Sequence, residues 1–477
     1  MTVDFTTYQP PGVFVEEDLS TLVSVAGLTP TVVAIVGPGR GHRLGNETIV
    51  MDDDDGIQLQ GEGVDLATVV VTATDGTEYV VDVDYSLDAD PDAPTYTLLI
   101  REVAGGIGAG ETVFVTYEYT DTDYYNPLRV FDFDDVQAAY GPPLDLSTGA
   151  ITSALSFAAK IAFDNGAREI VCVATEGDMD VDVASADLVT GYAKLSTIYD
   201  IDIIVPLPVG ITGSDATPGD TYTVGTDLRT HLINMEGENL FRIGIVGYES
   251  DVTILPVTTA TNISHKRVVL AWPQVLRYYH GFTNTTIDVS GYYLAAAYAG
   301  RIASNPIQMP LTKKQIVSFN GFSSSVLQTM TNTVKNAWSA GGVAVTEMTR
   351  NGDLVVRHGT TTDRTNTNSR EISLVRARDN LINLIQDTVD GAGLIGSWID
   401  GDTPGQVKSI VAGALEVAVD ADLIVQYNDL KARQLTSDPS VIEVKFQYIP
   451  AYPLNYIVIS FSINTETGET TVNEEGA

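Results

Sequence analysis

Short apolar runs alternate with helix-length amphipathic stretches over the middle of the chain, from about residue 126 to residue 320. The expected strands are residues 169–175, 202–207, 240–248 and 267–272. The expected helices are residues 151–165, 185–199, 226–237 and 291–304. Strands that alternate with helices in this way favour a mostly parallel sheet. The apolar run at residues 31–37 also has the character of a fully buried strand.

Residues from about 50 to 125 follow a different pattern, in which short strand-like runs are separated by Asp, Gly and Pro. The expected strands are residues 67–72, 78–83, 96–100 and 112–119. This pattern predicts an all-β module of the sandwich type. Between Met51 and Tyr125 there are eighteen Asp or Glu residues and one basic residue, Arg101, a formal balance of −17. So acidic and turn-rich a module is expected to be an exposed insertion.

Residues 341–477 form a further expected unit. Asn351 and Gly352 lie between two apolar runs, and the Asn-Gly pair is a strong hairpin signal. Amphipathic helices are expected at residues 370–389 and 404–419. Strands are expected at residues 441–449 and 456–463.

The two ends of the chain carry strand-like segments that lack an obvious local partner. Pro10, Pro11 and Gly12 oppose a helix, and the short strand expected at residues 13–17 follows them. In the last strand, one apolar face is formed by Ile457, Ile459, Phe461 and Ile463. A strand outside a sheet must satisfy its backbone groups at an edge elsewhere.

These patterns predict an α+β multidomain chain of 477 residues, which is too long for one ordinary core. The expected parts are an N-terminal linker arm (1–25), an α/β middle domain (26–49 and 126–340), an inserted acidic all-β sandwich-like domain (50–125) and an α+β C-terminal domain (341–477) that ends in an exchange strand.

Charge and cysteine content narrow the classes of function. There are 63 Asp and Glu residues against 26 Lys and Arg residues, a formal net charge of −37, which disfavours direct nucleic acid binding. The single cysteine, Cys172, excludes an internal disulfide and lies in an apolar run, so a buried thiol is expected. No apolar run approaches the roughly 20 residues that span a bilayer, and no signal peptide is evident. Assembly in a cytoplasm without membrane insertion is therefore expected.

Motifs for enzyme chemistry fail on inspection. The turn from Gly37 to His42 follows a buried strand, but it lacks the third glycine of a dinucleotide site and the Gly-Lys-Ser/Thr of a phosphate loop. The acidic loop at residues 52–55 departs from an EF-hand, because Gly56 and Gly63 stand where acidic ligands belong. A solvated acidic loop explains these residues better than a dedicated calcium site, and whether the loop binds a cation stays open. We therefore expect no catalytic residues, no cofactor and no dedicated metal site.

Basic residues gather in the C-terminal region of this acidic chain. They are Arg370, Arg376, Arg378, Lys408, Lys431 and Arg433. They are candidate contacts for an acidic partner surface, with Arg376, Arg378, Lys408, Lys431 and Arg433 as the main candidates. Ordinary salt bridges along helices are the alternative explanation.

Several segments resemble contractile tail sheath proteins of bacteriophages. The matching segments are residues 11–17, 31–37, 40–41, 131–136, 140–141, 165–167, 295–305 and 454–463. No single segment is specific, but their order, spacing and presence near both termini make a combined signal. Residues 50–125 depart from the shared pattern and fit the variable outer insertions of that family.

The resemblance implies that both ends exchange into the C-terminal domains of neighbouring copies. The implied exchange residues are Val13, Phe14, Val15, Glu16 and Glu17 at one end, and Ile457, Val458, Ile459, Phe461 and Ile463 at the other. It also implies a structural, non-enzymatic subunit that polymerises as a helical homo-oligomer of stacked rings. Its implied partners are the tail tube, baseplate and tail terminator proteins, and its implied place is the virion tail, after assembly in the host cytoplasm. The sheath of a bacterial contractile injection system is the alternative.

Overall fold

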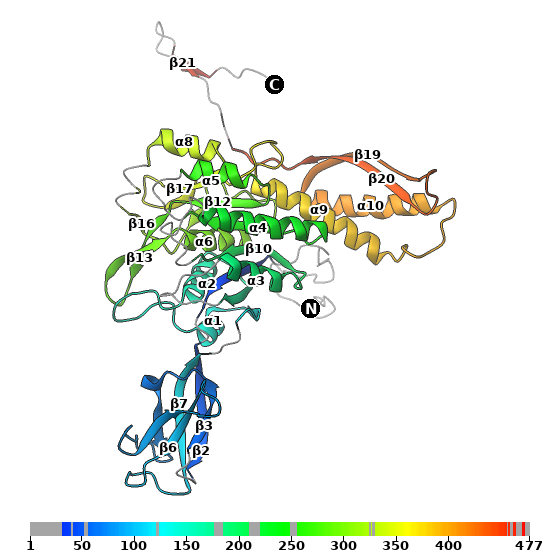
Figure 1. The fold of residues 1–477 in the computed structure, drawn as a ribbon. Coiled ribbons are helices and arrows are strands. Elements are labelled where there is room, and N and C mark those ends of the chain that lie inside the picture. The colour runs from blue at the N-terminus through cyan, green and yellow to red at the C-terminus, as the bar shows by residue number, and fades with distance from the viewer. Residues whose placement is uncertain are drawn as a thin grey trace, which may run out of the picture. The chain divides into compact units, whose positions relative to one another are not determined.

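A computed structural model describes most of the chain. The described residues are 31–39, 42–51, 56–120, 124–175, 185–208, 220–248, 255–323, 326, 330–455, 457, 461–463 and 470–472. They divide into two compact units (Figure 1), one running from Thr31 to Arg376 and taking in the described residues from Tyr452 onward, the other running from Ala377 to Ala451.

The larger unit is built on a mixed nine-stranded sheet. From one edge to the other, its strands are β15 (Gln315–Ile316), β18 (Leu354–Val356), β17 (Val343–Met348), β12 (Val268–Trp272), β11 (Ile243–Gly247), β10 (Ile201–Pro206), β1 (Val32–Pro38), β9 (Ile170–Thr175) and β8 (Leu128–Val130). Every pairing from β9 to β17 is parallel, and only the edge pairings are antiparallel. The predicted mostly parallel sheet is confirmed.

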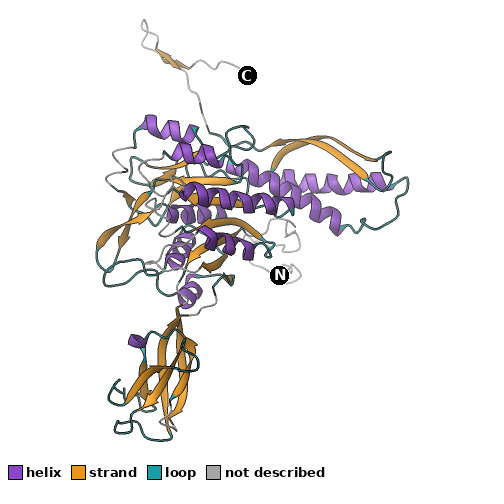
Figure 2. Cartoon of the chain, in the orientation of Figure 1, coloured by secondary structure: helices purple, strands orange, loops and turns teal. Residues whose placement is uncertain are grey.

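Helices cover both faces of this sheet (Figure 2). As a result, β1, β9, β11 and β12 are buried at every position. The helices are α1 (Phe133–Tyr140), α2 (Ala154–Asp164), α3 (Ser185–Leu195), α4 (Asp220–Gly237), α5 (Pro256–Ile263), α6 (Tyr292–Ala303) and α8 (Asn332–Ala340). A second antiparallel sheet contains β13 (Val275–His280), β14 (Thr285–Ser290) and β16 (Gly321–Phe322). Helices α2 and α6 cross closely at Gly300, where a Cβ atom would lie 2.1 Å from the carbonyl oxygen of Ala162.

The insertion folds around its own hydrophobic core. One of its three-stranded sheets contains β2 (His42–Met51), β7 (Glu111–Thr120) and β4 (Val70–Ala73), and the other contains β3 (Ile57–Glu62), β6 (Tyr96–Arg101) and β5 (Tyr85–Ala89). A short 3-10 helix, η2, spans Leu66–Thr68. Residues of the two sheets, such as Leu59, Val71 and Tyr117, are buried in one shared core. Two antiparallel sheets over one core agree with the expected sandwich type, although residues 78–83 form turns and isolated bridges instead of a strand.

Two boundaries differ from the sequence-based expectation. Strand β2 pairs with β7 over its full length, from His42 opposite Thr120 to Met51 opposite Glu111, so the β module begins before residue 50. Strand β17 pairs in parallel with β12 in the main sheet, so residues 341–376 belong to the larger unit. The hairpin predicted at Asn351-Gly352 is confirmed, since it joins β17 to β18 and Gly352 adopts a positive φ of 91°.

Helix α9 (Ile372–Gly391) crosses the boundary between the two units. The smaller unit contains the part of α9 from Ala377 onward, together with helix α10 (Thr403–Asp420) and two strands. The strands are β19 (Ile424–Gln434) and β20 (Ile442–Pro450), joined as an antiparallel pair. The two predicted helices and β20 are confirmed, whereas β19 was not predicted. Among the described residues, no helix combines the length and apolar character needed to cross a membrane.

Candidate assembly surface

The β19–β20 sheet of the smaller unit is incomplete in the described part of the chain. It has only two strands, so one edge of each strand has no strand beside it. Tyr427 lies opposite Tyr448, and Arg433 lies opposite Glu443. Two-stranded sheets are marginally stable in water, and open strand edges are templates for pairing with further chain. These edges are therefore the candidate assembly surface.

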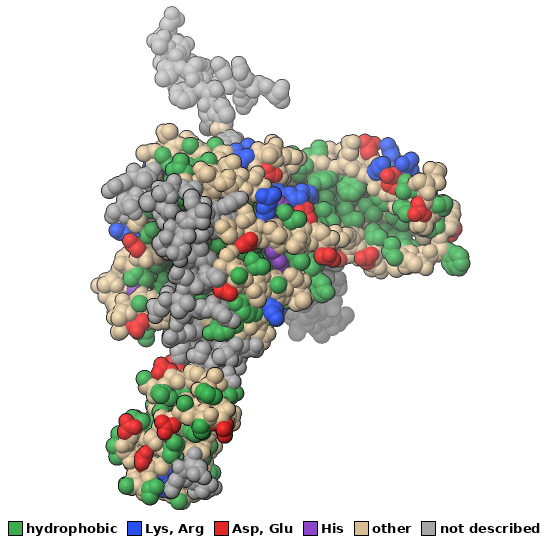
Figure 3. Space-filling view, viewed as in Figure 1, with side chains coloured by type: hydrophobic (Ala, Val, Ile, Leu, Met, Phe, Trp, Pro, Cys, Tyr) green, Lys and Arg blue, Asp and Glu red, His purple; other side chains and the backbone are tan. Residues whose placement is uncertain are grey.

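The packing of this sheet is one-sided. On β20, Val444, Phe446 and Tyr448 are half-buried, while the residues between them are exposed. The hydroxyl of Tyr427 donates a 2.6 Å hydrogen bond to Glu416 on helix α10. Figure 3 shows hydrophobic side chains gathered over α10 and these strands, and Val425 remains 57% exposed. The unit has a partly covered apolar face next to two open edges.

Exposed charges lie toward the turn of the same hairpin. Arg433 contacts Glu443 at 2.8 Å and Lys445 contacts it at 2.9 Å, whereas Lys431 lies 4.0 Å from Asp429. Hydrogen bonds from Lys445 and Arg433 lower the pKa of the Glu443 carboxyl. Two of the five candidate contacts, Lys431 and Arg433, are therefore brought together on one strand.

The remaining basic candidates are scattered. Lys408 is exposed on α10, and Arg378 on α9 lies 3.2 Å from Asp379. Arg376 is only 6% exposed and belongs to the larger unit, where its Nη2 donates a 2.9 Å hydrogen bond to the hydroxyl of Thr31. This contact occupies Arg376 inside the unit, unlike the exposed role expected from the sequence.

A half-buried carboxyl accompanies Arg376 at the start of β1. The backbone N–H of Val32 donates a 2.9 Å hydrogen bond to Asp202. Burial raises the pKa of Asp202 to about 6, while that hydrogen bond and the charge of Arg376 act in the opposite direction. The polar group therefore anchors the first described residues to the main sheet.

The predicted exchange segments are described only in part. Residues 13–17, Val458 and Ile459 lie outside the described residues, and Ile457 is 73% exposed. Strand β21 (Phe461–Ile463) pairs with β22 (Thr470–Val472), so the last strand has a local partner that the sequence did not reveal. The β-branched residues of β22 favour this pairing, but it covers only three residues on each side.

Metal-ligating side chains do not cluster in the part of the chain that the structure describes. The described residues contain no group of three or more side chains suited to a metal ion. Cys172 is fully buried in β9, which confirms the expected buried thiol, and burial raises the pKa of the thiol to about 12. The acidic loop at 52–55 lies outside the described residues.

Known proteins resemble the chain over most of its length. The tail sheath protein of Mycobacterium phage Bxz1 is 35% identical over 433 residues, which are 88% of this chain and 71% of that protein. The tail sheath protein of Bacillus phage SP01 is 24% identical over 258 residues, 54% of this chain and 44% of that protein. No family model matches the chain.

Solved structures share the fold. The anti-feeding prophage helical sheath in its contracted state aligns with a TM-score of 0.56 at 12% identity, over 96% of this chain and 100% of that one. The contracted PVC sheath complex of an extracellular contractile injection system aligns with a TM-score of 0.55 at 13% identity, over 96% of this chain and 99% of that one. Because the 35% identity extends over 88% of the sequence, the chain belongs to the tail sheath proteins, a structural and non-enzymatic family.

Proposed function

We propose that this chain is the repeating subunit of a contractile viral tail sheath. Copies polymerise around a tail tube as stacked rings, and contraction drives the tube through the host envelope for genome ejection. The observation that carries the proposal is the 35% identity to a phage tail sheath protein over 88% of the chain. The assembled protein then belongs to the virion tail, after assembly in the host cytoplasm.

Strand exchange is the proposed joint between copies. The open edges of β19 and β20 accept residues 13–17 from one neighbour and the segment around 457–463 from another. Strand addition supplies a ladder of main-chain hydrogen bonds, each worth about 1 kcal/mol net. The partly exposed apolar side chains of the β19–β20 unit support this proposal, because an added strand would cover them. For the segment ending in β21 to be donated, its three-residue pairing with β22 has to open or travel with it.

Such a joint propagates because the donating and accepting surfaces differ. A heterologous contact that does not close into a ring continues as a helical array. The larger unit, with its continuous core, acts as a rigid body that rotates while the strand joints survive. The extended sheath is then a kinetically trapped state, and the contracted sheath is lower in free energy.

The proposed partners are further copies, the tail tube, the baseplate and the tail terminator. Association with a baseplate is supported by the fold shared with a chain of the anti-feeding prophage baseplate, at a TM-score of 0.54. The sheath of a bacterial contractile injection system is the second candidate, because one of the similar solved sheaths belongs to an extracellular contractile injection system. The phage identity of the curated relatives favours the viral tail.

Truncation of either end tests this proposal. Purified full-length protein is expected to form tubes, visible by negative-stain microscopy. Removal of residues 1–20 or of residues 456–477 is expected to leave folded monomers, because each deletion removes one proposed exchange strand. Cutting after Asn455 preserves its 3.0 Å hydrogen bond to Glu371, so the larger unit keeps that contact.

Excision of the insertion is the matched control for those truncations. His42 lies opposite Thr120, so residues 43–119 can be replaced by a short glycine linker that joins these two paired positions. The excised protein is expected to form tubes, although it loses far more residues than either truncation. Tubes from the truncated proteins, or a full-length protein that stays monomeric under all conditions, would contradict the proposal.

A further inference from the structure

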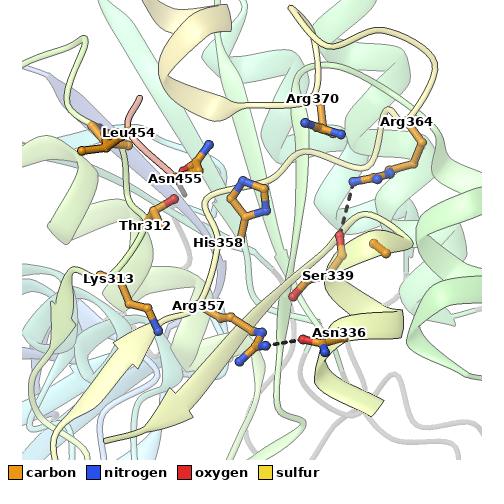
Figure 4. A pocket seen from close by; sticks show the side chains of 12 residues that line it. Thr312, Lys313, Asn336, Ser339, Arg357, His358, Arg364, Arg370, Leu454 and Asn455 are labelled. Atoms are coloured by element: carbon orange, nitrogen blue, oxygen red, sulfur yellow. Dashed lines mark hydrogen bonds between the residues drawn. The ribbon is translucent and has the colours of Figure 1, made fainter. Parts of the chain in front are cut away.

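A cavity in the larger unit has five basic residues among the twelve that line it (Figure 4). It has a volume of about 550 Å³ and lies among the segments before β15, the end of α8 and the stretch between β18 and α9. The lining side chains with positively charged, imidazole or hydroxyl groups that could contact a ligand include Lys313, Ser339, Arg357, His358, Arg364 and Arg370. In the described part of the chain, none of the residues lining it is Asp or Glu.

The cavity holds an excess of positive charge. Four permanent cations line it, in a chain that has only 26 Lys and Arg residues and a net charge of −37. Two carboxylates lie beside the lining. Glu347 contacts Lys313 at 2.5 Å, Arg357 at 2.6 Å and also Lys335 at 3.0 Å, while Glu371 contacts His358 and accepts a 3.0 Å hydrogen bond from Asn455. Glu347 therefore faces three cations, and the charges of Arg364 and Arg370 leave the surroundings of the cavity net positive even with Glu371 counted.

Polar groups in the cavity wall also lack partners. The Nε of Arg370 is buried and has no hydrogen-bond partner among the described residues. The hydroxyl of Ser339, a residue that is 8% exposed, is likewise buried without a partner there. Arg364 donates a 3.3 Å hydrogen bond to the carbonyl oxygen of Ser339 (Figure 4). Buried donors without partners are costly unless a ligand satisfies them.

We propose that this cavity binds a small, multiply charged oxyanion of the phosphate class, such as a pyrophosphate group. Guanidinium groups match the geometry of phosphate oxygens, and the hydroxyl of Ser339 adds a neutral donor. The volume exceeds what a single side-chain carboxylate would fill and lies within the range of small-molecule sites. The site requires no assembly, so the proposal stands independently of the proposed function.

Calorimetry of the full-length chain tests this proposal. Sodium pyrophosphate is expected to bind at one site per chain, whereas sodium chloride at matched ionic strength is not. Arg370→Gln and Arg364→Gln are each expected to weaken binding by about tenfold, the order of effect for one charge-assisted hydrogen bond. Arg350→Gln is the matched control, since Arg350 is exposed in the turn between β17 and β18 and the same charge is lost.

Three results would overturn the proposal. The first is the absence of pyrophosphate binding to the wild-type chain at low salt. The second is an equal loss of affinity in Arg350→Gln, which would indicate general charge attraction. The third is tighter binding of a hexa-aspartate peptide than of pyrophosphate, which would assign the cavity to an acidic peptide segment. Thermal unfolding of each variant establishes that it is folded, and the wild-type titration decides the proposal even if one variant is not.

Discussion

The main sheet of the larger unit and the β19–β20 sheet of the smaller unit differ in how completely their strands are paired and buried. In the main sheet, nine strands pair side by side, and β1, β9, β11 and β12 are buried throughout. In the smaller unit, the two described strands pair only with each other among the residues that the structure describes, and most of their residues are exposed or half-buried.

This contrast separates the part of the molecule that stabilises the fold from the part that is available for assembly. A sheet that is buried on both faces satisfies its backbone and side chains within one chain. A two-stranded sheet with open edges leaves that requirement to other chains or to solvent. A change in the main sheet should therefore act on folding, while a change on the hairpin should act on association.

The largest expected effect comes from truncating a buried aromatic side chain, which would create a new cavity in the core of the larger unit. Phe157 is fully buried on α2, and its ring packs edge-on against Tyr278 and Tyr293 at centroid distances of 5.0 and 4.7 Å. Phe157→Ala should cost about 3–5 kcal/mol of unfolding free energy, measured by urea titration. Val425→Ala on β19 is the control, because its side chain is 57% exposed and should change that free energy little.

Glu347 gives the next largest effect. Burial would raise the pKa of its carboxyl, but hydrogen bonds from Lys313, Lys335 and Arg357 outweigh burial and lower it to about 2, from an ordinary value of 4.5. A carboxyl with a lowered folded-state pKa stabilises the fold above about pH 4.5, and this stabilisation is lost as the pH falls toward 2.

Glu347→Gln should therefore destabilise the larger unit by about 2 kcal/mol at pH 7, after allowance for solvent screening. The difference from wild type should shrink steadily below about pH 4.5, as measured by urea unfolding across pH. The exposed Glu238→Gln is the control and should show no such difference. A gap that stays constant down to pH 3 would show that Glu347 acts through packing and not through its charge.

The sequence predicted the main sheet well because buried strands and amphipathic helices each leave a strong local pattern. The apolar run that became β9, for example, is continuous, and it alternates with helix-length segments. Strand β19 was missed because its exposed positions, including Gln426, Asp429 and Lys431, interrupt any apolar alternation. Irregular pairing between Asn428 and Lys431 further removes the period of two, and Asp429 adopts a positive φ of 55°.

The basic cavity could not be predicted, because its residues are scattered along the chain. Lys313, Ser339 and Arg370 come from three separate segments, and tertiary folding alone brings them together. The boundary between the two units at residue 376 also could not be predicted from local sequence. The hairpin at Asn351-Gly352 was recognised, but the parallel pairing of β17 with β12 is a contact between residues about 70 positions apart, which no local pattern reports.

The smallest effect on stability is expected from the charged hairpin, where association should change instead. Lys431→Glu combined with Arg433→Glu should alter unfolding by less than about 1 kcal/mol, because both side chains are exposed and their ion pairs are screened. If the hairpin meets an acidic surface of a partner, the same change should reduce the amount of protein that sediments as tubes.

High salt should reproduce this loss in the wild-type protein, since screening weakens exposed charge attraction. Arg350→Glu, outside the smaller unit, is the matched control and should leave sedimentation unchanged. Full tube formation by the double variant would mean that Lys431 and Arg433 serve only the local ion pairs with Asp429 and Glu443. In that case the joint rests on strand addition and apolar burial alone, and only the truncations of the two ends should break it.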